Sequence, residues 1–279
     1  MVEVQNPVKS CLDKYETLLK VLKKYDYPAV ALSGGVDSTL LLKASVEALG
    51  DRVIAITSTS PIHATREIAA AKSVAKAFGV EHICFDPKMM DDDNFVRNSQ
   101  ERCYHCKRRM FEAMKETLFA RDCQTLLHGV NCDDLKEFRP GLRAAQELRV
   151  AAPMVEAGLT KKDIRAMASH LGLEVADKPS MSCLATRIPY DTPITEEALV
   201  RIAGAEKILW ELGFRQFRVR HHGIVARIEF SKPDLARLFE ASLLQAVADG
   251  VKRAGYRHVA ADLEGYEPGR TDREYQPPS

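Results

Sequence analysis

The stretch PAVALSGGVDSTLLLKASVEALG, residues 28–50, decides the fold. Residues 29–32 form a short apolar run, which predicts a buried parallel strand. Residues 39–49 place apolar side chains at helical spacing and end at Gly50, which predicts a helix. The segment SGGVDS, residues 33–38, therefore joins a buried strand to a helix.

Strands and helices continue to alternate on both sides of this stretch. The predicted elements are a helix at 8–24, strands at 52–56, 82–85 and 125–129, and helices at 65–78 and from Cys106 onward. Such alternation is typical of an α/β fold with a doubly wound parallel sheet and helices on both faces. We predict this fold for residues 1–190.

The pattern changes after about residue 192. Residues 216–220 and 224–230 alternate polar and apolar side chains, as strands with one wet face do. The other elements predicted here are helices at 194–212 and 234–248 and a strand at 258–263. We therefore expect a smaller C-terminal α+β domain, residues 191–279, for substrate binding or oligomerisation.

Composition and charge limit the function classes. The chain has 279 residues, of which 46% are hydrophobic, so it can bury a substantial core. Its formal charge of +1 creates no long-range attraction to nucleic acid or anionic lipid. The sequence shows no signal-peptide pattern and no run of roughly 18 apolar residues. These observations predict a cytoplasmic protein with neither a nucleic-acid nor a membrane partner.

The segment 33–38 has the composition of an anion-binding loop. Adjacent glycines let a backbone approach an anion closely, and the amides of the first helical turn point toward it. The loop has neither the Walker A spacing nor the GxGxxG spacing. Its place after a strand of an open α/β sheet favours ligand binding over the alternative, an ordinary glycine turn that caps a helix. The predicted ATP contacts are Ser33, Gly34, Gly35, Asp37, Ser38 and Thr57, with Asp37 also expected to bind Mg²⁺.

SGGVDS resembles the PP-loop of the ATP pyrophosphatase superfamily, whose fold is adenine nucleotide α-hydrolase-like. The resemblance implies that ATP is cleaved to AMP and pyrophosphate while a carboxylate or carbonyl oxygen is adenylated. A nitrogen or sulfur nucleophile then displaces AMP. The loop thus implies the reaction type but not the nucleophile.

Three of the seven cysteines are candidates for that nucleophile. Cys103 and Cys106 lie three residues apart at the opening of a helical stretch, and Cys183 lies in a loop. Three thiolates can hold a [4Fe-4S] cluster with one iron open to carry sulfide. Alternatively, Cys183 alone gives up its sulfur and becomes dehydroalanine. We expect the other four, Cys11, Cys84, Cys123 and Cys132, to be small buried packing residues.

Several longer segments resemble the LarE family of ATP-dependent sulfur transferases. They are RCYHCK, GVNCDDLKEFRPGLRAA (129–145), VEAGLTKKDIRAMASHLGLEVADKPSMSCLATRIPYDTPIT (155–195), FRVRHHGIVARIEF (217–230) and DLEGYEPG (262–269). The resemblance implies that both carboxylates of pyridinium-3,5-biscarboxylic acid mononucleotide are adenylated by MgATP and converted to thiocarboxylates for the nickel-pincer cofactor. Because all three cysteines are present, it favours the cluster-bearing members. It also implies a homo-oligomer.

Further polar residues are candidate substrate contacts. Arg218 and Arg220 fall on one face of a predicted strand, and paired guanidiniums suit a nucleotide monophosphate and a carboxylate. The alternative is a solvated strand face with Glu229 as an ion-pair partner. The roles of Lys107, Arg187 and Glu206 rest on the family resemblance. Asn131, Asp133 and Asp134 either contact nucleotide or metal or merely cap the next helix.

Three other functions share parts of this pattern. A tRNA-thiolating enzyme has the same loop and cysteines, but it would need a broad basic surface that a charge of +1 disfavours. An amide-forming synthetase that uses ammonia would give the three cysteines no task. A nucleotide-binding sensor would have the loop without catalysis.

Overall fold

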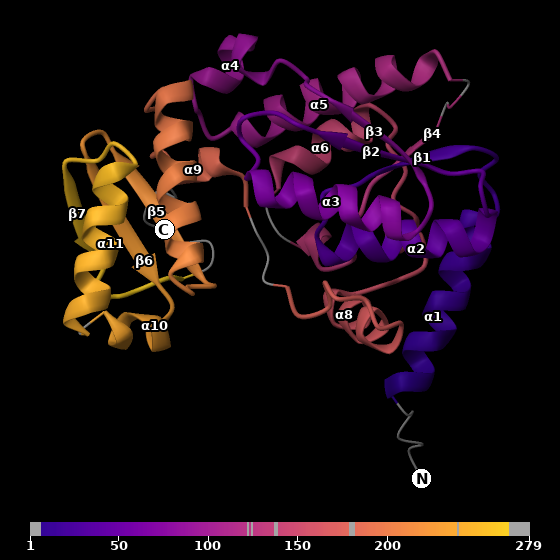
Figure 1. Cartoon of the computed structure of the whole chain (residues 1–279). Helices are drawn as coiled ribbons and strands as arrows, with labels where there is room; N and C mark the ends of the chain where they lie inside the picture. The colour runs from indigo at the N-terminus through magenta and orange to yellow at the C-terminus, as the bar shows by residue number, and fades with distance from the viewer. Residues whose placement is uncertain are drawn as a thin grey trace. The chain divides into compact units, whose positions relative to one another are not determined.

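The computed structural model describes residues 7–121, 123, 125–136, 139–178, 182–238 and 240–267. The chain forms two compact units (Figure 1). Unit 1 comprises Met1–Met89 and Glu101–Met181, and unit 2 comprises Met90–Gln100 and Ser182–Ser279. This division groups 182–190 with the C-terminal part. The domains 1–190 and 191–279 stay a prediction about independently folding parts of the chain.

Unit 1 is built on a four-stranded parallel sheet with the strand order β3-β2-β1-β4. The strands are β1 (Pro28–Ala31), β2 (Ile54–Ser58), β3 (Glu81–Phe85) and β4 (Thr125–Leu127). The chain winds outward from β1 to β3 and then returns to place β4 on the other side of β1. The winding direction therefore reverses between β1 and β4, which is where open α/β sheets bind ligands beyond their strand ends.

Helices cover both faces of this sheet. They are α1 (Pro7–Leu22), α2 (Val36–Leu49), α3 (Thr65–Ala77), α5 (Arg102–Phe119), α6 (Pro140–Glu147), α7 (Pro153–Glu156) and α8 (Lys161–His170), with the 3-10 turn η2 (Asp134–Lys136). Val30 and Leu127 of the sheet share one core with Leu41 of α2 and Ile164 of α8. In Figure 1, α2, α3 and α8 lie below the strands and α5 lies above them. The predicted doubly wound α/β fold is confirmed.

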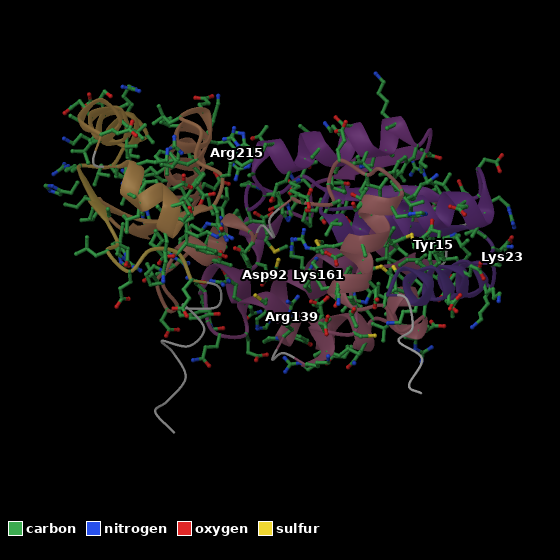
Figure 2. All side chains as sticks on the ribbon, turned by 90° about the horizontal axis from the view of Figure 1, so that it is seen from below. Tyr15, Lys23, Asp92, Arg139, Lys161 and Arg215 are labelled. Atoms are coloured by element: carbon green, nitrogen blue, oxygen red, sulfur yellow. The ribbon has the colours of Figure 1, made fainter. Side chains whose placement is uncertain are left out.

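The first two helices show how local sequence sets the edges of these elements. Gly35 is the N-cap of α2, so this helix begins at Val36, three residues before the predicted start at 39. Tyr15 of α1, labelled in Figure 2, donates a hydrogen bond of 2.9 Å to Glu47 of α2. This bond and the apolar side chains of α1 fix the leading helix on the body of unit 1.

Unit 2 has a three-stranded sheet of order β5-β6-β7, in which β5 and β6 are antiparallel and β6 and β7 are parallel. Its elements are α4 (Asp93–Val96), η3 (Leu184–Arg187), α9 (Glu196–Glu211), β5 (Phe217–His222), β6 (Val225–Phe230), α10 (Lys232–Arg237), α11 (Ala241–Arg253) and β7 (His258–Ala261), and the 3-10 turn η1 (Met89–Asp91) leads into it. One core joins Val219, Ile228 and Val251, and the rings of Phe214 and Phe230 lie 4.7 Å apart. This separate α+β region confirms the predicted fold class.

The single helix predicted at 234–248 is wrong, because the segment forms two helices, α10 and α11. Ser231 caps α10 by accepting a hydrogen bond from the Asp234 amide, so that helix begins earlier. It ends where Leu238 is buried in the core, and Glu240 then takes an extended backbone conformation before α11.

Residues 90–100 belong to unit 2 because buried Asn98 ties them to it. Its side-chain amide donates to the carbonyls of Pro189 at 2.7 Å and Thr192 at 2.8 Å. Its own carbonyl accepts from the amide of Asp191, 3.1 Å away. In the described part of the chain, no helix is long and apolar enough to cross a membrane.

Candidate active site

The segment between β1 and α2 is shaped by a glycine that no other residue replaces easily. Gly34 has a φ of +73°, in the left-handed region that favours glycine. A Cβ atom on Gly34 would lie 2.9 Å from the backbone nitrogen of Ala71 and 3.1 Å from the carbonyl oxygen of Glu67. Both conformation and contact with α3 therefore require glycine here.

Hydroxyl groups close this loop on itself. The amide of Ser33 donates to Ser38 Oγ at 3.1 Å, and the two serine hydroxyls lie 3.0 Å apart. Ser38 Oγ also donates to the carbonyl of Gly35 at 3.2 Å. No side chain caps α2 at Gly35. The amides of the first turn of α2 therefore form the kind of helix N-terminus that binds phosphate.

Thr57, the predicted contact at the end of β2, supports the loop from the next strand. Its hydroxyl donates to the carbonyl of Leu32 at 2.7 Å and lies 2.8 Å from His82 Nε2. Because the threonine hydrogen is used on Leu32, His82 Nε2 carries the hydrogen and donates to Thr57. Thr57 thus fixes the backbone just before the loop.

Buried polar atoms follow β2 at the same edge of the sheet. The hydroxyls of Ser58 and Ser60 and the Nδ1 atom of His63 are buried and have no hydrogen-bond partner among the residues that the structure describes. Such groups cost free energy unless a ligand or water satisfies them. Their position at the carboxyl end of β2 marks this edge as a place for a polar ligand, which the sequence alone did not single out.

Asp37, in the first turn of α2, is held on both carboxylate oxygens. The side-chain amide of Asn131 donates to Oδ1 at 3.3 Å, and the ammonium of Lys161 contacts Oδ2. Asn131 also donates to Asp134 Oδ2 at 2.7 Å, and Asp133 Oδ2 accepts from the Lys161 amide at 2.9 Å. The loop after β4 therefore links α2 to α8. Binding of nucleotide or metal by Asn131, Asp133 and Asp134 stays a prediction.

The carboxylate of Asp37 is of the ligand type that fits Mg²⁺. Carboxylate oxygen is the ligand that Mg²⁺ prefers, and this one is beside the phosphate loop. The Lys161 ammonium already places a positive charge on Asp37 Oδ2. Mg²⁺ bound to this oxygen would take the place of the ammonium.

Cys103 and Cys106 lie in the first turns of α5, and both are partly exposed. No side chain caps this helix at Glu101, so its dipole favours negative charge near its start. None of the seven cysteines forms a disulfide bond. Two thiols one helical turn apart fit two ligands of an iron–sulfur cluster.

Lys107, the next residue on α5, lies among aromatic and imidazole groups. Its ammonium is 5.5 Å from the centre of the Phe111 ring, and that ring packs edge-on against His128 at 5.8 Å. Burial, reinforced by the positive charge of Lys107, lowers the pKa of His63 and of His128 to about 4. Both imidazoles are therefore neutral at neutral pH, and Lys107 carries the positive charge of this group.

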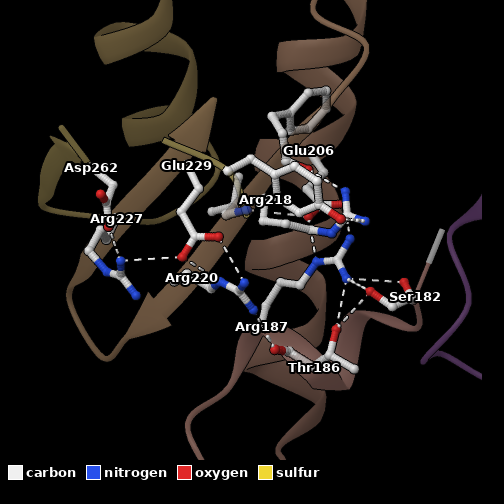
Figure 3. Close-up of polar contacts among 12 residues, drawn as sticks. Ser182, Thr186, Arg187, Glu206, Arg218, Arg220, Arg227, Glu229 and Asp262 are labelled. Carbon is white, nitrogen blue, oxygen red and sulfur yellow. Dashed lines mark hydrogen bonds and ion pairs between the residues drawn. The ribbon is translucent and has the colours of Figure 1, made fainter. Parts of the chain in front are cut away.

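Cys183 precedes a tight 3-10 turn in unit 2 that is held by Arg187 (Figure 3). The Arg187 side chain has no exposed surface, and its Nη1 atom donates to Ser182 Oγ at 2.7 Å, Thr186 Oγ1 at 2.8 Å and the Cys183 carbonyl at 3.2 Å. Its Nε and Nη2 atoms donate to the two carboxylate oxygens of Glu206 at 2.7 and 3.2 Å. The Arg187–Glu206 pair therefore fixes the backbone that carries Cys183.

Glu206 keeps its negative charge in this buried site. Burial alone would raise the pKa of Glu206, but the charge and hydrogen bonds of Arg187, together with the charge of Arg218, lower it instead. The backbone amide of Val219 also donates to Glu206, at 3.3 Å. Arg187 and Glu206 are thus brought together as a buried ion pair, and their binding of substrate stays a prediction.

Arg218 and Arg220 share one face of β5, opposite the core residue Val219. The alternative of a solvated strand face is wrong, because Arg218 and Arg220 are 5% and 8% exposed. Arg220 donates to both carboxylate oxygens of Glu229, at 2.9 and 2.8 Å, and to the Thr186 carbonyl at 2.9 Å. The expected Glu229 ion pair is therefore present, but it is buried.

The arginine cluster of unit 2, labelled in Figure 3, contains Arg187, Arg218, Arg220 and Arg227 together with Glu206, Glu229 and Asp262. It therefore carries more positive than negative charge. Burial, followed by the charge of Arg187, lowers the pKa of Arg218 to about 10. Arg218 lies over the ring of Tyr266 at 4.6 Å and donates to its hydroxyl at 3.2 Å. A guanidinium whose charge is disfavoured by its neighbours is stabilised when an anion binds beside it.

The remaining cysteines follow the sequence prediction only in part. Cys11 and Cys123 are buried, as expected, and Cys132 is partly exposed. Cys84 is exposed, which corrects the prediction, because it lies on β3 at the edge of the sheet. Among the described residues, no group of three or more His, Cys, Asp and Glu side chains gathers as a metal site. Cys103 and Cys106 belong to unit 1 and Cys183 to unit 2, so a shared cluster stays a prediction.

Two lysines that contact the loop of residues 33–38 were not predicted from the sequence. Lys161 contacts Asp37, and the ammonium of Lys178 donates to the carbonyl of Gly34 at 3.0 Å. Lys161 begins α8 and Lys178 follows this helix, both more than a hundred residues from the loop, so their spacing carries no signal. The Thr160–Asp163 capping box does mark the start of α8 in the sequence, but it does not say which sheet edge the helix approaches.

Comparison with known proteins places the chain in a family. A family model described as queuosine biosynthesis protein QueC matches residues 28–117, which span the loop. An uncharacterized protein of Synechocystis sp. is 35% identical over 93% of this chain and 97% of its own length. The pyridinium-3,5-bisthiocarboxylic acid mononucleotide synthase of Lactiplantibacillus plantarum is 32% identical over 92% of this chain and 93% of its own length. The chain belongs to the family of this synthase, the LarE family.

A further relative of the LarE-family chain matches only in part. The tRNA-specific 2-thiouridylase MnmA of Rickettsia africae is 30% identical, over 54% of this chain and 51% of its own length. The membership is consistent with the parallel sheet and its loop in unit 1, and the resemblance found in the sequence is confirmed.

Proposed function

We propose that the protein is an ATP-dependent sulfur transferase that converts the carboxylates of pyridinium-3,5-biscarboxylic acid mononucleotide into thiocarboxylates. The observation that carries this proposal is the 32% identity to a synthase named for the bisthiocarboxylic product, over 92% of the chain. The placement of SGGVDS at the reversal point of the sheet supports it, because this is where a nucleotide would bind.

The first step is adenylation of a substrate carboxylate. A carboxylate oxygen attacks the α-phosphorus of ATP, the bond to the bridging oxygen breaks, and pyrophosphate leaves. The amides of α2 and the loop around Gly34 would hold the leaving phosphates, and Ser33 and Ser38 keep that loop closed. Asp37 would hold Mg²⁺, which supplies charge neutralisation for the phosphates when bound.

The second step replaces AMP by sulfur. A [4Fe-4S] cluster held by Cys103, Cys106 and Cys183 would supply the sulfide in the route that we favour. In the alternative route, the Cys183 thiolate attacks the acyl adenylate and releases AMP, forming a thioester. Loss of the Cα proton and cleavage of the Cβ–S bond then leave a thiocarboxylate and dehydroalanine. In both routes Arg187 holds the Cys183 backbone in place.

We assign recognition of the anionic substrate to the arginine cluster of unit 2. Arg218 has a lowered pKa caused by burial and by Arg187, so an anion beside it would be stabilised. Guanidinium groups bind phosphate and carboxylate with paired hydrogen bonds. Lys107, Arg187, Glu206 and Arg220 stay predicted substrate contacts, as do the homo-oligomer and the cytoplasmic location.

Thiolation of tRNA is the second candidate function, favoured by the partial match to MnmA. That match covers about half of each chain, and the formal charge of +1 gives no broad attraction to RNA. One assay distinguishes the two proposed functions. Pyrophosphate release from ATP should rise with the pyridinium substrate and not with tRNA.

The decisive experiment compares pyrophosphate release with and without the pyridinium substrate. Release that does not depend on this substrate would refute the proposal. Anaerobic purification with an iron count then separates the sulfur sources. The cluster route predicts about four irons per chain and an unchanged mass of Cys183 after turnover. The sacrificial route predicts loss of H₂S mass at Cys183 and activity in Cys106→Ala without iron.

A further inference from the structure

The phosphate loop has no positively charged side chain of its own. Residues 33–38 contain no lysine or arginine, and their one charged residue is the acidic Asp37. The amides of α2 supply only a partial positive charge, about half an elementary charge at a helix start. Besides Mg²⁺, a triphosphate that binds here would therefore gain from positively charged side chains of other segments.

Two lysines are brought to the loop, one from the start of α8 and one from the segment that follows this helix. Lys161, labelled in Figure 2, is the first residue of α8, and its ammonium contacts Asp37 Oδ2. Lys178 follows α8 and donates to the carbonyl of Gly34 at 3.0 Å. Each ammonium has three N–H groups, so Lys178 can keep its bond to the Gly34 carbonyl and also donate to a bound phosphate.

The fold holds both lysines against the loop. The start of α8 is fixed by the capping box of Thr160 and Asp163 and by the bond from the Lys161 amide to Asp133. On the other side, Arg165 of α8 donates to the carbonyl of Lys178 at 3.1 Å, which ties the chain after α8 back to the helix. One helix therefore sets the position of both cations.

The environment of each lysine also favours a further anionic partner. Burial lowers the pKa of Lys178, and the charge of Arg66 opposes its protonation while Glu67 favours it. An ammonium that has lost hydration in this way gains free energy when a phosphate binds beside it. Lys161 offsets the charge of Asp37, which would otherwise repel phosphate from the loop.

We infer that Lys161 and Lys178 bind the β- and γ-phosphates of ATP and thereby supply the cations that the loop lacks. This inference rests on the proposed use of ATP. It gives the KPSMSC segment a task besides Cys183, since Lys178 is its first residue. Lys161 would move from Asp37 toward phosphate when the nucleotide binds.

The test is calorimetric binding of pyrophosphate without Mg²⁺, and of ATP and AMP, to four forms of the full chain. They are the wild type, Lys161→Gln, Lys178→Gln and the control Lys162→Gln, which changes an exposed neighbour on α8. We expect each of the first two variants to weaken pyrophosphate and ATP binding about tenfold or more. AMP binding should stay unchanged, and the control should match the wild type. Pyrophosphate binding of wild-type strength in both Gln variants would overturn the inference.

Two further forms separate contact from indirect effects. Lys161→Gln combined with Asp37→Asn removes both charges of the pair. If Lys161 only neutralised Asp37, this double variant would regain pyrophosphate binding, which would overturn the direct contact; persistent loss would support it. Lys178→Arg keeps the charge and should retain more binding than Lys178→Gln. Thermal melting of every form shows whether it is folded.

These measurements distinguish failure of the lysine assignment from failure of the proposed reaction. A wild type that binds pyrophosphate through both lysines but releases none from ATP would support this site and contradict the proposed reaction. A wild type that binds neither ATP nor pyrophosphate would contradict both. Substrate-dependent release together with lysine-independent binding would contradict only the lysine assignment.

Discussion

The two units hold their candidate anion sites in opposite ways. In unit 1 the loop between β1 and α2 is made of backbone, glycine and two serine hydroxyls, and the two lysines that contact it lie at the start of α8 and beyond the end of that helix. In unit 2 the anion site is made of long side chains, with Arg187, Glu206 and Glu229 almost fully buried. The first site depends on backbone geometry, whereas the second depends on a balance of buried charges. The same class of substitution should therefore have different effects in the two units.

Breaking the buried charge balance should have the largest effect. Arg187→Leu leaves Glu206 buried and without its bidentate partner, so we expect it to lower the free energy of unfolding by about 3–5 kcal/mol. Denaturant unfolding, followed by a signal from unit 2, measures this. Replacing both residues with Leu should cost less than Arg187→Leu alone. Lys207→Ala, in the exposed Lys207–Glu211 pair, should cost less than about 1 kcal/mol. If Arg187→Leu cost as little as Lys207→Ala, the buried pair would contribute little to the free energy of unfolding.

Backbone geometry in unit 1 is tested by comparing two glycines. Gly34 and Gly79 both have positive φ, but a Cβ would strike Ala71 only at Gly34, since nothing lies within 4 Å at Gly79. Gly79→Ala should therefore cost about 1 kcal/mol and leave ATP binding unchanged. Gly34→Ala should cost about 2–3 kcal/mol and abolish measurable ATP binding. Equal effects in calorimetry would mean that the close contact with α3 does not shape the loop.

The difference between the two candidate sites also explains which of their residues could be predicted from the sequence. SGGVDS was identified because a backbone site needs particular residue types at adjacent positions. The arginines of β5 were found from their alternation, but that pattern could not show that they are buried with Glu206 and Glu229. Lys161 and Lys178 were missed because long-range contacts leave no local pattern. Hence the loop and the α/β fold class of unit 1 followed from local sequence, whereas the contacts of Lys161 and Lys178 with the loop did not.

Asp191 shows the same limit at a single residue. The LarE-family resemblance covers this segment, but only the structure shows that Asp191 has a φ of +61°. Glycine adopts this conformation without strain, and aspartate tolerates it better than most residues. The boundary between α10 and α11 was also missed, because burial of Leu238 ends the first helix and no breaking residue marks the place.

Lowering the pH should destabilise unit 1 before it breaks the ion pairs of unit 2. The pKa of His63 and of His128 in the folded chain is about 4, below their usual 6.5. The unfolded chain therefore binds more protons between these values, and stability is present above pH 6.5 and falls as pH falls toward 4. We expect a loss of about 1–3 kcal/mol for each histidine over this range. In unit 2, the charge and hydrogen bonds of Arg187 lower the pKa of Glu206 against the effect of burial, so this carboxylate resists protonation.

Substitution of the two histidines should flatten this pH dependence. His63→Gln with His128→Gln removes both groups, and urea unfolding at several pH values measures the slope. The exposed His170→Gln is the matched control and should leave the slope unchanged. Half-buried His221 in unit 2 also has a pKa lowered by burial and by Arg201, so a smaller slope should remain. An unaltered slope in the double variant would show that these imidazoles do not cause the acid sensitivity.

The smallest expected effects come from removing a threonine N-cap in each unit. Thr160 caps α8 by accepting from the Asp163 amide at 3.3 Å, and Thr195 caps α9 by accepting from the Ala198 amide at 3.1 Å. Alanine at either position should cost about 1 kcal/mol. Only Thr160→Ala loosens the helix start that carries Lys161, so only this variant should weaken pyrophosphate binding, by about threefold. If Thr195→Ala weakened binding equally, general loss of stability rather than the position of Lys161 would explain the effect.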